Sequence, residues 1–312
     1  MTKIIIKESI TNPNKGKYPE MREIRELIEY GIVNIDKPAG PTSHLVTANV
    51  SKIVGASKGG HSGTLDPGVS GVLPVAFDKA TRIMEIFLKT GKEYVCLMRL
   101  HKEIDDKILN KVFDKFRGKI QQLPPVRSAV KRQLREREIY KIEILERKDK
   151  FVLFRVSCQA GTYIRKLCSD IGVLIGGAHM QELRRTRVGP FNEDNITTIT
   201  EIKDNYEFWK TKKDESGLRK NIIPIEEAVS FLKKIWVLDS AVENLCNGSD
   251  LYSGGISALE DAIKKDETIA IFTLKDELVS IGTARLDAAK IKNSRSCVAK
   301  NGKVFMKLGT YR

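Results

Sequence analysis

The chain has few of the residues that build disulfide-rich or metal-binding proteins. Of its 312 residues, five are cysteine and four are histidine. The cysteines are odd in number and scattered without a C-x-x-C pair, which argues against a disulfide framework and against a zinc site of the usual spacing. The histidines show neither an H-x-x-x-H nor an H-E-x-x-H pattern. We therefore predict reduced thiols and no bound metal.

Long apolar runs are also absent. No stretch approaches the ~20 apolar residues that a membrane-spanning helix needs. The apolar run near the start of the chain is too short for a signal peptide, and it lacks a small-residue cleavage site. Hydrophobic residues still make up 41% of the sequence. These features predict a cytoplasmic globular protein, and the length favours one large domain with a smaller one.

Positive charge is in excess. The sequence has 54 Lys+Arg against 40 Asp+Glu, a formal net charge of +14. Such an excess favours a polyanionic partner, with nucleic acid as the first candidate, and a solvated basic surface is the alternative. Arginine is concentrated in segments 127–137 and 184–187. We expect both segments to be loops that contact phosphates, which position a nucleic acid without reading its sequence.

The periodicity indicates an α+β fold. Apolar residues alternate as in a strand over 92–100, and further strands are expected at 31–38, which proline ends, and at 139–146 and 151–158, which flank a turn. Helical spacing follows Ser43, Asp78 and Asp105 and runs from Ile164 to Ile175. Because hairpins and helices interleave without a regular βαβ period, we expect a mainly antiparallel central sheet.

Beyond residue 232 the pattern changes to short apolar runs between Gly-rich turns. We expect the strands of a small β-barrel at 235–238, 268–273, 278–282 and 304–306. A polar stretch, 204–220, lies before this change. The expected organisation is an N-terminal extension over 1–20, a large domain over 21–232 and a small domain over 233–312.

The most informative segment runs from His61 to Val75. It sets a single carboxylate, Asp66, in a turn rich in glycine, with Pro67 directly after it. Glycine permits unusual backbone angles and proline fixes φ, so the turn should be stiff. A carboxylate displayed in this way can act as a nucleophile. Asp-Pro is also the ordinary start of a type I turn, and turn chemistry alone favours that structural role.

Arg165 falls in the first turn of an expected helix, where a cation opposes the helix dipole unless an anion compensates. Asp66 is one candidate for that anion, because an ionised carboxylate and a guanidinium offset each other's charge. A surface pair with Asp170 is the alternative.

Three further side chains have two possible roles each. Tyr94 and Tyr163 can stack on a nucleobase or pack in the core. His44, next to an expected helix start, can fill the space that an extruded base vacates or cap the helix. The residues alone leave these alternatives open.

Four ordered motifs resemble those of the TruB/dyskerin pseudouridine synthases. They are GIVNIDKP with GPTSH from Gly31, GHSGTLDP from Gly60, KEYV from Lys92 and GTYIR from Gly161. The resemblance covers about residues 20–312. Segment 177–187 is similar to the archaeal H/ACA guide-RNA branch, and the part after residue 232 resembles a PUA domain.

The resemblance implies that the protein isomerises uridine in RNA to pseudouridine without a cofactor or a metal. Asp66 would be the nucleophile or base, Arg165 would pair with it, and Tyr94 would stack on the target base and take part in proton removal. The target base would be flipped out of its stack. The residues expected to line the pocket or contact RNA are His44, His61, Tyr163, Arg185, Arg127, Lys131 and Arg132.

The resemblance also implies a ribonucleoprotein. An H/ACA guide RNA would choose the uridine in rRNA, the PUA domain would hold the guide, and the N-terminal extension would pack on the PUA domain. Nop-type, Gar-type and kink-turn-binding ribosomal-type proteins would be partners, and no membrane would be involved. Two alternatives remain: a stand-alone enzyme for tRNA uridine-55, and a non-catalytic RNA-binding scaffold. A scaffold has no need for Asp66, Tyr94 and Arg165 together.

Overall fold

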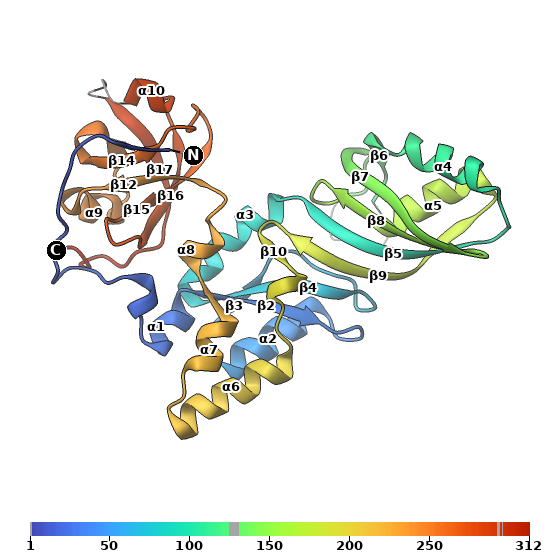
Figure 1. Cartoon of the computed structure of the whole chain (residues 1–312), viewed down its shortest axis with the longest axis horizontal. Coiled ribbons are helices and arrows are strands. Elements are labelled where there is room, and N and C mark those ends of the chain that lie inside the picture. The colour runs from blue at the N-terminus through green and yellow to red at the C-terminus, as the bar shows by residue number, and fades with distance from the viewer. Residues whose placement is uncertain (1, 125–130, 292–293, 295) are drawn as a thin grey trace. The chain divides into compact units, whose positions relative to one another are not determined.

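The computed structural model describes residues 2–124, 131–291, 294 and 296–312. These residues form two compact units. The first unit comprises Met1–Ile32, Phe77–Arg82 and Leu218–Arg312, and the second comprises Val33–Ala76 and Ile83–Gly217. Figure 1 shows the helices and strands from which each unit is built. In the described part of the chain, no helix combines the length and apolar character that a membrane crossing needs.

The second unit contains a mixed sheet in the order β2-β4-β9-β5-β8-β7-β6. Strand β5 pairs antiparallel with both β8 and β9, whereas β4 and β9 pair in parallel. The expectation of a mainly antiparallel sheet is therefore confirmed. The strands are β2 (Gly31–Lys37), β3 (Gly59–His61), β4 (Ser70–Phe77), β5 (Lys92–Leu100), β6 (Gly118–Gln122), β7 (Arg135–Lys148), β8 (Phe151–Cys158), β9 (Ala178–Val188) and β10 (Phe191–Asn192).

Helices α4 and α5 pack on this sheet because each has one apolar face (Figure 1). Asp105 caps α4 by accepting a hydrogen bond from the Lys107 amide. Helix α5 ends at Gly176, whose φ of 84° is left-handed and suits glycine. The helices of the unit are α2 (Ser43–Ile53), α3 (Met84–Lys89), α4 (Asp106–Lys115), α5 (Ile164–Ile175) and α6 (Ile199–Lys212), with α7 (Ser216–Asn221) at its boundary. The 3₁₀ helix η2 (Asp78–Ile83), which precedes α3, falls almost entirely in the first unit.

One segment of this unit differs from the sequence-based prediction, and another contains helices that the sequence analysis did not predict. Residues 184–187 lie within β9 and are not a loop. A strand tolerates these arginines because their side chains have acidic or carbonyl partners. The polar stretch 204–220 contains most of α6 and α7. Helix α6 buries Ile202 alone, so it lacks the apolar period from which a helix is predicted.

The first unit is built on a sheet in the order β1-β14-β12-β15-β16-β17-β13. Buried aliphatic side chains from these strands and from α9 form its core. Of the expected strand at 304–306, only Val304 lies in a strand, as the last residue of β17, which begins at Cys297. The elements are β1 (Lys3–Ile5), α1 (Ile24–Glu29), β11 (Ile222–Pro224), α8 (Ile225–Ala228), β12 (Lys233–Val237), α9 (Asp239–Cys246), β13 (Leu251–Tyr252), β14 (Ile256–Glu260), β15 (Thr268–Phe272), β16 (Leu278–Ala284), α10 (Ala288–Ile291) and β17 (Cys297–Val304), with short 3₁₀ helices at Pro19–Met21 and Ser253–Gly255.

The N-terminal segment is part of this unit. Strand β1 extends the sheet by pairing antiparallel with β14. Farther along, the buried ammonium of Lys275 donates to the carbonyl oxygens of Pro13, Lys15 and Gly16 at 3.1, 2.6 and 3.4 Å. The loop is therefore held through its backbone, which explains why its side-chain sequence carries little pattern.

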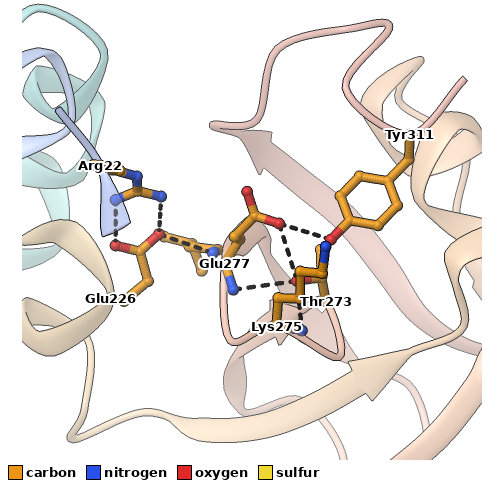
Figure 2. Close-up of polar contacts among 7 residues, drawn as sticks. Arg22, Glu226, Thr273, Lys275, Glu277 and Tyr311 are labelled. Carbon is orange, nitrogen blue, oxygen red and sulfur yellow. Dashed lines mark hydrogen bonds and ion pairs between the residues drawn. The ribbon is translucent and has the colours of Figure 1, made fainter. Parts of the chain in front are cut away.

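A buried polar network continues from this loop (Figure 2). Arg22 donates two hydrogen bonds of 2.8 Å to Glu226, which also accepts from the Leu278 amide. The Tyr311 hydroxyl donates to Glu277 at 2.7 Å, and burial raises the pKa of Glu277. Buried ion pairs contribute little net stability, but removing one partner is costly. The network therefore makes the register of these segments specific.

A substitution at Gly16 tests how tightly this loop is packed. Its φ is +62°, and an added Cβ would lie 2.3 Å from Glu277 Oε2 and 2.4 Å from the Tyr311 hydroxyl. We expect Gly16→Ala to cost about 1 kcal/mol through backbone strain and a further ~1–3 kcal/mol through overpacking. Gly248→Ala is the matched control, because φ is +90° and no atom lies within 4 Å of its Cβ position. Equal losses of unfolding free energy in urea would contradict the prediction.

Candidate active site

The carboxylate of Asp66 lies on the turn that joins β3 to β4. The backbone carbonyl of Asp66 accepts a hydrogen bond from the Val69 amide at 3.0 Å, so the backbone forms the expected turn. The carboxylate forms an ion pair with Arg165. The two side chains are 55% and 51% exposed, respectively. A reactive carboxylate is therefore both displayed to solvent and held by a cation.

The turn is held on one side by residues of β2 and α2. The Ser43 hydroxyl accepts from the Leu65 amide at 2.8 Å. The ammonium of Lys37, which is buried, donates to the carbonyl oxygens of Pro67 and Val69 at 3.1 and 2.7 Å. Burial and the charge of Arg185 lower the pKa of Lys37. These contacts fix the residues on both sides of Asp66.

Arg165 reaches Asp66 from the first turn of α5. The residue before this helix, Tyr163, exchanges two backbone hydrogen bonds of 3.0 and 3.1 Å with the side chain of Gln122. Gln122 is buried. Sequence reasoning missed this residue because a lone glutamine at the end of a strand carries no signal. The other anion considered for Arg165, Asp170, pairs with Lys166.

Tyr94 projects from β5 and is partly buried. Burial raises the pKa of Tyr94, and the neighbouring Arg185 guanidinium opposes that rise. Tyr94 and Arg185 are register partners on β5 and β9. The structure thus brings a phenol and a guanidinium together beside the loop of Asp66.

The two histidines of the predicted site form a pair. The rings of His44 and His61 lie 4.9 Å apart at an interplanar angle of 68°. His44 is exposed in the first turn of α2, while His61 accepts a hydrogen bond of 3.3 Å from the Gly63 amide. The pair therefore borders the loop of Asp66 on its β3 side.

The predicted basic residues are not equivalent in the structure. Lys131 and Arg132 are exposed. Arg184 pairs with Asp36 and Glu193, so it is committed to acidic partners. The segment 184–187 therefore does not form the phosphate-binding loop that its arginine content indicated. Arg127 lies outside the described residues.

The site offers a carboxylate, a guanidinium and a phenol. Such a set can attack a carbon centre, hold the resulting charge and move a proton. Among the described residues, no group of three or more His, Cys, Asp or Glu side chains is arranged to hold a metal ion.

Comparison with known families assigns the class of the protein. The model of the TruB family pseudouridylate synthase N-terminal domain matches residues 51–164, and that of the tRNA pseudouridylate synthase B C-terminal domain matches 165–230. The DKCLD domain matches 1–47 and the PUA domain matches 233–304. The chain belongs to the TruB family of pseudouridine synthases, enzymes that isomerise uridine to pseudouridine in RNA.

Two individual relatives are similar to this chain over almost its whole length. A protein of Methanothermobacter thermautotrophicus named "Probable tRNA pseudouridine synthase B" is 50% identical over 310 residues, covering 99% of this chain and 96% of its own. A protein of the same name from Methanosarcina barkeri is 52% identical over 303 residues, covering 96% of this chain and 90% of its own. The family, the fold class and the PUA domain expected from the sequence are confirmed.

Two solved structures are similar over almost the whole chain. "Crystal Structure of a Cbf5-Nop10-Gar1 Complex" contains a chain that is 48% identical, with a TM-score of 0.92 and coverage of 99% of this chain and 95% of that one. "Structure of H/ACA RNP bound to a substrate RNA containing 2'-deoxyuridine" contains a chain that is 45% identical, with a TM-score of 0.92 and coverage of 100% of this chain and 96% of that one.

The environment of His61 predicts that the folding stability of the protein depends on pH. Burial, His44 and Arg185 lower the pKa of His61 to about 4, whereas an unfolded imidazole titrates near 6.5. As pH falls from about 6.5 to 4, the unfolded chain binds a proton that the folded chain does not. Stability should therefore fall through this window by about 1–2 kcal/mol, the loss being limited because His61 is partly exposed.

The measurement is the unfolding free energy of the wild type and His61→Gln at pH 7 and pH 4. The variant should lose less stability than the wild type between these two values. His179→Gln is the control, because its ring contacts His101. A wild-type-like loss in His61→Gln would rule out this residue as the source.

Proposed function

We propose that this protein uses Asp66 to isomerise a uridine that an H/ACA guide RNA selects. The observation that carries the proposal is the Asp66–Arg165 ion pair, on a loop that is contacted by Arg185, the cross-strand partner of Tyr94. Within a pseudouridine synthase, this is the set of groups that the isomerisation needs. Members of one catalytic set that come from a loop, a helix and a strand require the whole fold to assemble them.

The proposed reaction begins when the Asp66 carboxylate initiates cleavage of the bond between the ribose C1′ and N1 of uracil. The freed uracil rotates and bonds to C1′ through C5, after which the proton on C5 leaves and N1 becomes protonated. Tyr94 stacks on the base and takes part in removing the C5 proton. Substrate and product are isomers, so the proposal includes no cofactor. Arg165 holds the carboxylate in place through their ion pair.

A uridine can reach Asp66 only when its base is turned out of the RNA stack. We expect His44 and Tyr163, which lie at the starts of α2 and α5, to contact the RNA around that nucleotide. Lys131 and Arg132, which are exposed, supply phosphate contacts. Arg127 belongs to the same proposed segment. His61 and Arg185 support the pocket from within.

The proposed particle follows from the solved relatives. Their titles name Nop10 and Gar1 with Cbf5, and an H/ACA ribonucleoprotein with substrate RNA. We infer that this chain likewise binds guide and substrate RNA together with Nop-type and Gar-type proteins and a kink-turn-binding ribosomal-type protein. The net charge of +14 suits such a polyanionic partner. We also infer a cytoplasmic location, where its free cysteines stay reduced.

A second candidate substrate is tRNA. Several curated relatives bear the name tRNA pseudouridine synthase B. In that case the protein would modify tRNA uridine-55 without a guide, using the same Asp66 chemistry.

Asp66→Asn tests the chemistry. The amide is neutral and a poor nucleophile, so we expect the rate of pseudouridine formation to fall by at least about 1,000-fold. RNA affinity should survive, because the side chain is one of many contacts. Asp170→Asn is the matched control, since Asp170 also pairs with a basic residue of α5 and should leave the rate unchanged. Unchanged turnover in Asp66→Asn would remove this residue from the reaction.

Guide dependence needs a separate measurement. Purified protein is incubated with rRNA fragments or tRNA, with and without a guide RNA and the accessory proteins, and pseudouridines are mapped along each RNA. We expect rRNA modification only when the guide is present and base-paired to the target. Modification of tRNA at full rate by the protein alone would favour the stand-alone enzyme instead.

A further inference from the structure

Arg185 is among the largest fully buried side chains of the protein, with 1% of its surface exposed. Its guanidinium donates to the Val72 carbonyl at 2.8 Å and to the Gly63 carbonyl at 3.2 Å through both terminal nitrogens. Gly63 and Val72 lie on either side of Asp66 in the sequence. One side chain therefore ties together the two ends of the catalytic loop.

The same guanidinium acts on Tyr94. The two residues face each other across β5 and β9, and the positive charge of Arg185 opposes the rise that burial causes in the pKa of Tyr94. Reciprocally, burial lowers the pKa of Arg185, and Tyr94 opposes that change. Among the described residues, no acidic side chain forms an ion pair with Arg185. The guanidinium charge of Arg185 can therefore act on the phenol of Tyr94.

A second buried cation lies on the same strand as Tyr94. The Lys92 ammonium donates to the carbonyl oxygens of Phe87, Leu88 and Thr90 at 2.7, 2.9 and 2.7 Å. Burial and the charge of Arg185 lower the pKa of Lys92 to about 8. Two buried cations that disfavour each other's charge are thus retained on β5 and β9, an arrangement that costs stability.

The neighbours of Arg185 on β9 have other partners and more exposure. Arg184 forms ion pairs with Asp36 and Glu193. Arg187 has 57% of its side chain exposed, and its Nη2 lies 3.9 Å from Oε1 of Glu93. A side chain that contacts RNA phosphates must reach the surface. The buried position of Arg185 favours a role toward the protein's own groups.

We propose that Arg185 is a positioning residue that links Tyr94, its partner across β5 and β9, to the loop of Asp66 through the carbonyls of Gly63 and Val72. Its charge at this position favours the phenolate form of Tyr94. This rests on the proposed function, in which Tyr94 and Asp66 act on one flipped uridine. The planar fork of arginine bonds to two carbonyls at a fixed angle. Lysine at this position keeps the charge and loses that fork, so the two variants separate geometry from charge.

The test compares Arg185→Lys and Arg185→Gln with Arg187→Gln, which removes an exposed cation from the same strand. Single-turnover rates at saturating RNA, RNA dissociation constants and the ionisation of Tyr94 are measured. Tyr94 is followed by phenolate absorbance, each protein being compared with its own Tyr94→Phe derivative. The Asp66→Asn variant shows in parallel that the assay reports Asp66-dependent chemistry.

We expect the single-turnover rate to fall about 10–100-fold in Arg185→Gln, with RNA affinity within about twofold of the wild type. The Tyr94 ionisation should move to higher pH in Arg185→Gln and much less in Arg185→Lys, which should recover part of the rate. Arg187→Gln should keep the wild-type rate and Tyr94 ionisation. If Arg185→Gln does not fold, Arg185→Lys alone should still lose rate without losing RNA affinity.

Three results would overturn the proposal. The first is a wild-type rate in either Arg185 variant. The second is a Tyr94 ionisation that does not change in folded Arg185→Gln. The third is weaker RNA binding with a lower salt dependence and a normal rate at saturation, which would make Arg185 a phosphate contact. Each can occur while Asp66→Asn remains inactive, so failure here is distinguishable from failure of the proposed function.

Discussion

Buried positive charge beneath the loop of Asp66 is the constraint on which the site depends. Lys37 and Arg185 donate to backbone carbonyls on both sides of the carboxylate. Hydrogen bonds from charged donors are worth ~1.5–3 kcal/mol each, and they offset much of the cost of burying a cation. Because the carbonyls belong to the backbone, the loop is held without any contact that would block the Asp66 side chain. The carboxylate can therefore face solvent and still be fixed.

The same arrangement prepares the site electrostatically. Groups that are oriented before the substrate arrives need little rearrangement during the reaction, which is a main source of catalytic rate. Arg165 holds Asp66 from one side, and Arg185 acts on Tyr94 from within the sheet. Gln122 fixes the backbone at Tyr163 immediately before α5. Loop, helix and strand thus meet at one place because polar contacts across the sheet set their register.

Much of the large domain was predictable from local pattern. The period-2 alternation of 92–100 and the helical period of 164–175 agree with β5 and α5, since each buries one continuous face. Helix α6 was missed because it buries only Ile202. Strand β9 was missed because its arginines obscure the alternation, and their partners Asp36 and the carbonyls of the Asp66 loop are distant in the sequence.

For the site, the residue types were predictable and their relations were not. The ordered motifs around Asp66, Tyr94 and Arg165 point to the family by themselves, because stiff turns, strand starts and helix starts are local features. The choice of Asp66 over Asp170 as the partner of Arg165, and the burial of Arg185 beside exposed Arg187, were decided by the tertiary structure. The reason is physical: the strength of an ion pair and the exposure of a charge depend on distance and solvent access, and the fold sets both between residues about 100 positions apart.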